Sequence, residues 1–314
     1  MNDTVYFYIP GLAITFDINF VLIRRMYEYP DHFYPNVRIG GVFGTFPSAI
    51  WNGGRLSMGQ VDEDKVDYAL EVYRNLQIPL RWTWTNPTIT EEDLQDEYCN
   101  LITRKAEDGF NEVLVNNDLM ENYIRQNYPK YPIISSTTKR ITDIDALNAE
   151  LEKDYKLVVI DYDFNNRWEY IDKIAHPERC EILVNALCNP HCPMRKRHYE
   201  MIGKIQKGDY TAGEATIEGC PSQFRMMHEI KKLPHFISVE SIWEDYVPRG
   251  FRHFKIEGRE VNPIKPMEWY LYYLVKPEYQ EEERDWLEMG METACAMPNI
   301  PIYRPSILEE PNES

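Results

Sequence analysis

The chain alternates short apolar runs with longer stretches in which apolar residues recur every three or four positions. The short runs are rich in β-branched and aromatic residues and mostly end at Gly, Pro, Asn or Asp, as strands that lead into turns do. They predict eight strands, at residues 5–9, 37–43, 80–85, 112–116, 132–136, 156–161, 181–187 and 252–257.

Helices are predicted between most of these strands. Their apolar positions repeat with the helical period, and Asn117 is a favourable N-cap. These helical patterns cover residues 63–76, 91–109, 117–129, 143–154 and 165–174. Strands that alternate with helices predict a parallel sheet, and at this length a closed (β/α)8 TIM-like barrel. An open doubly wound sheet is the alternative, but no G-x-G-x-x-G fingerprint follows any predicted strand.

The second half of the chain contains more helix than a simple barrel requires. Residues 1–277 are predicted to form the barrel, and 194–251 a helical elaboration over its mouth, between strands seven and eight. Residues 278–314 are predicted to form a C-terminal helix and a proline-rich tail.

Composition narrows the class of protein. The chain has 314 residues, of which 43% are hydrophobic, so it can build one large core. Its net charge of −17 disfavours a broad nucleic-acid surface and leaves a small molecule, a peptide or a partner subunit as the expected ligand. The basic run at 195–197 is predicted to be a solvated helix face.

The start of the chain argues for a cytoplasmic location without membrane contact. The first residues, MNDTVYFYIPG, lack a basic region before their apolar stretch, which Pro10 and Gly11 interrupt. No apolar run approaches the roughly 20 residues of a membrane-spanning helix.

Six cysteines are too few for a disulfide framework in a chain of this length, so clustered thiols indicate a metal or redox role. Cys188 follows the predicted seventh strand and Cys192 lies on the loop beyond it, where the active groups of barrels gather. Cys180 begins the same strand and is therefore expected at the opposite face. Cys99 falls within a helical pattern and is expected to be a packed core residue.

Two further thiols, Cys220 and Cys295, complete a candidate set of four metal ligands with Cys188 and Cys192. Four thiolates suit a 4Fe–4S cluster or a zinc ion. A zinc site of three cysteines with His191 or His198 is a competing interpretation. Four unconnected thiols are the remaining alternative, because free cysteine is often merely buried.

Three segments carry a family resemblance. EVLVNNDLMENYIRQNYPKYPIISSTT (112–138), ALCNPHC (186–192) and FKIEGRE (254–260) resemble, in order and separation, the core of the collagenase-like peptidase family U-32. The likeness covers most of residues 5–277, and KIEGR at the end of a strand is its most specific piece.

The resemblance implies a TIM-like barrel with an oxygen-sensitive 4Fe–4S cluster. Relatives in this family are oxygen-independent hydroxylases. One kind acts on ubiquinone precursors as a heterodimer, and another acts on the tRNA wobble uridine. Both are thought to take the hydroxyl group from prephenate. Cys188, Cys192 and Cys220 match the family's ligand positions. The family's fourth cysteine often lies just before KIEGR, where this chain has none; either Cys295 replaces it or the fourth iron position is open to substrate.

Charged and polar residues at the strand ends complete the predicted site. Glu257 and Arg259 are the candidate catalytic residues, with Arg259 able to bind a carboxylate through two hydrogen bonds. Lys255 shares a strand face with Glu257, so the two are expected to pair. Arg55, Asn86 and Lys255 are the candidate substrate-binding residues. A structural salt bridge or a helix cap is the alternative role for these side chains.

These observations favour an iron–sulfur barrel enzyme that performs redox or hydroxyl-transfer chemistry. Alternatives are a peptidase of the U-32 type and a non-catalytic, metal-stabilised partner subunit. Hydrolysis has little support from residues, since the sequence contains neither H-E-x-x-H nor G-x-S-x-G and Ser135 lacks an evident base. Asp161 and Asp163 are either an acid–base pair or a turn.

Overall fold

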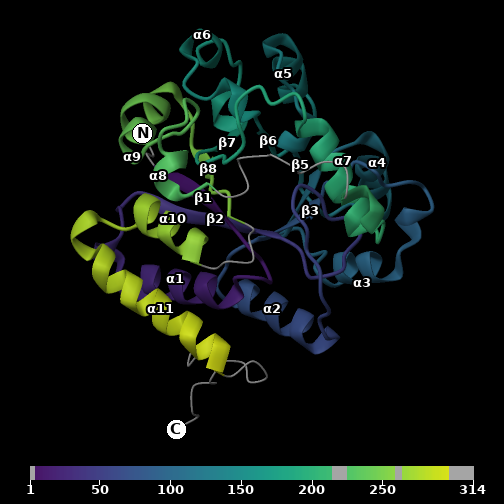
Figure 1. Ribbon diagram of the computed structural model, residues 1–314, viewed down its shortest axis with the longest axis horizontal. Coiled ribbons are helices and arrows are strands. Elements are labelled where there is room, and N and C mark those ends of the chain that lie inside the picture. Colours follow the sequence, from purple (N-terminus) through teal and green to yellow (C-terminus); the bar gives the residue numbers. More distant parts are fainter. Residues whose placement is uncertain (1–3, 214–224, 259–263, 297–314) are drawn as a thin grey trace.

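Eight parallel strands close into a barrel in sequence order, with helices around the outside (Figure 1). The computed structural model describes residues 4–213, 225–258 and 264–296. The strands are β1 (Val5–Pro10), β2 (Val37–Gly44), β3 (Leu80–Trp84), β4 (Glu112–Val115), β5 (Ile133–Ser135), β6 (Leu157–Val159), β7 (Cys180–Leu183) and β8 (His253–Lys255). Pairing of β1 with both β2 and β8 completes the ring, which confirms the predicted (β/α)8 fold.

Strand β7 is shorter than its apolar sequence predicts, because it ends at Leu183 rather than Leu187. The Val184 N–H still donates to the Lys255 carbonyl at 3.0 Å. Beyond it the Asn185 side chain replaces the strand ladder, since its amide donates to the Glu257 carbonyl and accepts from the Glu257 N–H. The chain leaves the sheet there, so the residues up to Cys188 form a loop above the strand.

Helices form the outer layer, and most lie where the periodicity predicts them. They include α2 (Glu63–Asn75), α3 (Glu97–Lys105), α4 (Asp118–Asn127), α5 (Ile144–Leu151) and α6 (Trp168–Ile171). Asn117 is the N-cap of α4, as expected, and its side chain accepts from the Met120 N–H at 2.9 Å. The helical periods therefore locate this layer well.

Helix α1 (Phe16–Glu28) is absent from the predicted elements. It packs against α11 (Gln280–Ala296) on its outer side, so its buried residues run without interruption from Ile18 to Ile23. Its apolar side chains nevertheless follow the helical period as clearly as those of α2, so α1 was predictable from the sequence. Figure 1 shows α11 alongside α1.

The barrel interior contains a charged layer among apolar side chains. The Arg81 guanidinium bonds to the carboxylates of Glu112 and Glu181, and the Lys255 Nζ lies 3.3 Å from Glu181. Arg81 also lies over the Tyr8 ring, 3.4 Å from its centroid. Arg81, Glu112, Glu181 and Lys255 are called the interior network below, and all four are buried.

Additional helices surround the ends of the barrel. Helices α7 (Arg195–Gln206), α8 (Met227–Ile230) and α9 (Val239–Ser241) lie between β7 and β8, and α10 (Ile264–Leu274) and α11 follow β8. Helix α7 begins at the end of β6, where Arg195 pairs with Asp161, and ends where Gln206 bonds to the Ala49 and Ser57 carbonyls. It therefore crosses the rim at the C-terminal ends of the strands. Among the described residues, no helix combines the length and the apolar character of a membrane span.

Candidate functional site

An ion pair at the barrel mouth joins two of the predicted site residues. Arg55, from the loop after β2, pairs with Glu257, which follows β8. The same carboxylate accepts the Leu187 N–H at 3.0 Å, and Leu187 directly precedes Cys188. Three strands therefore contribute loops to one locus, at the face where barrel enzymes carry their active groups.

Two thiols lie on the loop beside this ion pair. Cys188 and Cys192 are free and only partly buried, and Cys188 packs against Tyr162, Leu183 and Ala186. Between the thiols His191 adopts a left-handed backbone with φ of 51°. A non-glycine residue in this conformation is strained, so surrounding contacts must hold the loop in place.

Side chains from three other segments hold the thiol loop. Arg225 donates to the Leu187 carbonyl at 2.6 Å and also bonds to the Asn189 side chain. Asp163 accepts the His191 N–H at 2.9 Å, and Arg195 donates to the Asn189 carbonyl at 3.1 Å. Sequence analysis assigned no such role to Arg225, because a lone arginine carries no sign of the backbone that it contacts.

Arg195 belongs to a network of two aspartates and two arginines beneath this loop. It pairs with Asp161 and Asp163, each at 3.1 Å, while Arg140 reaches the same carboxylates at 2.9 and 3.2 Å. These four residues are called the mouth network below. The expectation that residues 195–197 form a solvated face is therefore wrong for Arg195, whose side chain is 1% exposed. The charge run was visible in the sequence, but its distant carboxylate partners were not.

The surroundings of the mouth network shift the pKa values of its two aspartates in opposite directions. Burial raises the pKa of Asp161 from its usual value, despite the lowering effect of Arg195. Burial acts in the same direction on Asp163, but the His191 N–H and Arg195 outweigh it and lower that pKa. Arg195 also lies over the Tyr162 ring, 3.8 Å from its centroid. This arrangement serves to hold structure, which favours the turn over an acid–base pair.

Two side chains of α7, Tyr199 and His198, lie near the thiol loop and the ion pair. Burial raises the pKa of Tyr199 to about 12, and the nearby Cys188 adds to the shift. Burial lowers the pKa of His198, and the positive charge of Arg55 lowers it further. Both groups are therefore uncharged near neutral pH.

Asn86 and Lys255 are bonded within the protein. The buried Asn86 amide donates to the Ile50 and Gly203 carbonyls at 2.7 and 3.0 Å, and so fastens α7 to the loop after β3. Lys255 lies inside the barrel, where its ion-pair partner is Glu181 on the adjacent strand and not the expected Glu257. A role in substrate binding stays a prediction for both residues.

The remaining cysteines and Arg259 are not found among the described residues of the mouth. Cys220 and Arg259 lie outside the described residues, and so does the side chain of Cys295 in the last turn of α11. Figure 1 shows α11 in the lower part of the view, well separated from β7. Cys180 at the start of β7 and Cys99 in α3 are buried, as expected.

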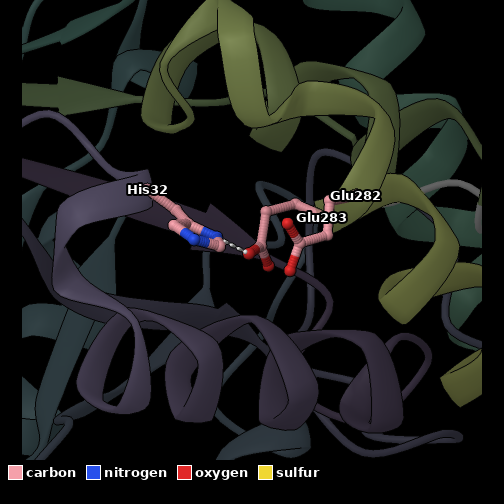
Figure 2. Close-up of side chains that lie close together, drawn as sticks. All are labelled: His32, Glu282 and Glu283. Carbon is pink, nitrogen blue, oxygen red and sulfur yellow. Dashed lines mark hydrogen bonds and ion pairs between the residues drawn. The ribbon is translucent and has the colours of Figure 1, made fainter.

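A histidine and two carboxylates form the one group of three candidate metal donors within 4.8 Å of one another in the described part of the chain. Figure 2 shows His32 facing Glu282 and Glu283. The Arg25 guanidinium already binds both carboxylates, at 2.7 Å for Glu283 and 3.3 Å for Glu282. This group therefore serves as an ionic clamp between α1 and α11.

Ser135 offers little as a nucleophile. Its buried hydroxyl donates to Glu150 at 2.6 Å. Burial raises the pKa of Glu150, but hydrogen bonds from Lys139, Lys153 and Ser135 outweigh it and lower the pKa to about 2. So weak a base does not activate a hydroxyl near neutral pH.

Comparison with known proteins gives limited information. No protein-family model and no curated protein matches the sequence. Among solved structures, the chain is similar to the U32 peptidase Mk0906, with a TM-score of 0.49 and 12% sequence identity. The match covers 82% of this chain and 94% of that chain. Similarity at this level establishes neither membership of a family nor an activity.

Proposed function

We propose that this barrel is an iron–sulfur enzyme that performs redox or hydroxyl-transfer chemistry on a small polar substrate. Cys188, Cys192 and Cys220 are the proposed ligands of a 4Fe–4S cluster, with Cys295 or a substrate atom at the fourth position. The observation that carries the proposal is the Glu257 carboxylate, which joins Arg55 to the backbone beside Cys188. It puts an anion-binding side chain next to a thiol loop at the mouth.

The donor set fits such a cluster as far as it is described. Both thiols of the loop are free and partly exposed, and thiolates are the usual ligands of iron–sulfur clusters. Arg225 lies against this loop and follows Cys220 by five residues. At up to about 3.6 Å per residue, that length keeps Cys220 within about 18 Å of Arg225. The length of the chain between Cys220 and Arg225 therefore allows a third ligand from this segment.

The chain's own residues would bind and shield the substrate. A guanidinium suits a carboxylate because it offers two parallel N–H groups, and Glu257 would orient Arg55 for that contact. The uncharged Tyr199 and His198 would limit the access of water from the side of α7. A bound cluster would supply electron transfer or a Lewis-acidic iron.

Anaerobic purification followed by iron and sulfide analysis tests the proposal. We expect a brown protein that contains both elements, and loss of both in Cys188→Ser and Cys192→Ser. Cys180→Ser is the matched control, since that thiol lies buried at the opposite end of β7 and should leave the iron content unchanged. A colourless protein free of iron would refute the proposal, and stoichiometric zinc would support the metal-stabilised partner subunit instead.

A further inference from the structure

A cavity of about 320 Å³ lies beside the mouth, between α7 and the loops that follow β4 and β5. Its polar lining includes Asn116, Thr138, Lys139, Lys153, Lys196 and Tyr199. Asn116 directly follows β4, and Thr138 lies just after β5. The cavity is therefore at the C-terminal face of the barrel, where ligands of this fold bind.

The cavity has an excess of positive charge. Three lysines line it, against the two carboxylates of Asp118 and Glu150. Lys139 and Lys153 share Glu150, one on each oxygen, at 2.7 and 2.6 Å. One negative charge thus balances two ammonium groups. The side chain of Lys139 is only 12% exposed, so its charge is held against the cavity wall.

Lys196 brings a further cation to the cavity, whose lining also includes the Asp118 carboxylate. Its side chain forms no ion pair or hydrogen bond within the described parts of the chain, and it neighbours Arg195, which the mouth network fixes in place. Thr138 and Asn116, which bond to each other at 2.7 Å, add neutral polar groups to the same wall. The lining therefore carries one more positive than negative charge in a chain whose net charge is −17, which favours an anionic ligand.

We propose that this cavity binds the anionic oxygen group, a carboxylate or a phosphate, of a small molecule. Lys196 and Lys153 donate charge-assisted hydrogen bonds to the anion, and the Thr138 hydroxyl completes its coordination. The site does not depend on any metal. It therefore stands or falls separately from the iron–sulfur proposal.

Isothermal titration calorimetry on the full chain tests this site, with inorganic phosphate and malonate as probes and the uncharged malonamide as a reference. Binding of phosphate or malonate, and not of malonamide, is expected. Tighter binding of phosphate would assign the site to phosphate esters, and tighter binding of malonate to carboxylates. Lys196→Gln should weaken the preferred anion about tenfold, as the loss of one charged hydrogen bond does.

Lys204→Gln is the matched control, because Lys204 is also exposed on α7 but does not line the cavity. It should change the affinity less than twofold, which would separate a local site from general attraction by α7. Absence of binding by both anions would overturn the proposal. Equal weakening by the two substitutions would do the same.

Discussion

The interior network and the mouth network use the same kinds of charged side chains for different purposes. In the interior network Arg81 joins carboxylates from β4 and β7, and all of its members are strand residues. In the mouth network Arg195 and Asp163 also bind backbone groups of the thiol loop. The first ties strand to strand, and the second ties a loop to the barrel.

This difference separates what stabilises the fold from what positions the site. Loss of Arg81 removes the one group that binds both Glu112 and Glu181, and it leaves each of these buried carboxylates with a single lysine, Lys156 or Lys255, which is costly. The mouth network has two arginines for two aspartates, so one arginine can still neutralise part of the charge when the other is removed. We therefore expect interior substitutions to act on stability and mouth substitutions on the thiol loop.

Arg81→Met should have the largest effect. It removes the guanidinium that Glu112 and Glu181 share and leaves each carboxylate with one lysine partner, which should cost about 3 kcal/mol of unfolding free energy. Urea denaturation followed by circular dichroism measures this loss. A cost below about 1 kcal/mol would mean that the interior network contributes little.

Arg195→Met should cost less stability, about 2–3 kcal/mol, because Arg140 remains beside both aspartates. It should also loosen the thiol loop, so that Cys188 and Cys192 react faster with a water-soluble disulfide reagent. Cys99 and Cys180 are buried internal references that should stay unreactive. Arg197→Met, on the exposed part of the same helix, is the control, and equal acceleration in both variants would contradict the role given to Arg195.

The interior should also respond to mild acid through His253, whose ring lies 2.8 Å from the Tyr8 hydroxyl. Burial lowers the pKa of His253 from 6.5 to about 4. Between those values the unfolded chain binds the proton and the folded chain does not, so stability should fall as the pH drops from about 6.5 to about 4. We expect His253 to contribute at most about 3 kcal/mol to this decline, because the pKa difference of about 2.5 units corresponds to about 1.4 kcal/mol per unit.

Urea midpoints measured across this pH range test the prediction. His253→Gln should flatten the pH dependence. A variant at position 253 with the same slope as the parent chain would show that another group titrates.

Arg55→Gln should have the smallest effect on stability, below about 1 kcal/mol, since both partners of its ion pair are partly exposed. The Leu187 N–H continues to satisfy Glu257, so the thiol loop should keep its reactivity. Thermal unfolding and the same thiol assay measure the two quantities. A large change in thiol reactivity would show that Arg55 supports the thiol loop, contrary to its proposed role in ligand binding.

The barrel could be predicted from the sequence because each strand is a local property of a few consecutive residues. The one clear overrun, at β7, occurred where the apolar run continues past Leu183 but the Asn185 side chain takes over the backbone bonds. Helix α1 was missed although its apolar positions follow the helical period. At β7 a contact with a distant segment overrides the local pattern.

Two of the predicted site residues lie at the mouth, but their pairing was not predicted. Arg55 and Glu257 were each expected at the mouth, yet their ion pair joins loops from opposite ends of the sequence. Strand alternation alone predicted that Lys255 pairs with Glu257. In the structure its partner is Glu181, on the neighbouring strand β7. Side-chain partners across strands depend on the register of the barrel, which a single sequence does not reveal.

Because the sheet closes on itself, each of its strands already has a hydrogen-bonded neighbour on both sides. Another polypeptide cannot attach by adding a strand, a common way for proteins to capture extended peptides or to aggregate. A companion subunit or a peptide would have to dock on the surrounding helices or on the loops at the rim. Mapping of such an interaction should therefore begin with surface substitutions on those helices and loops.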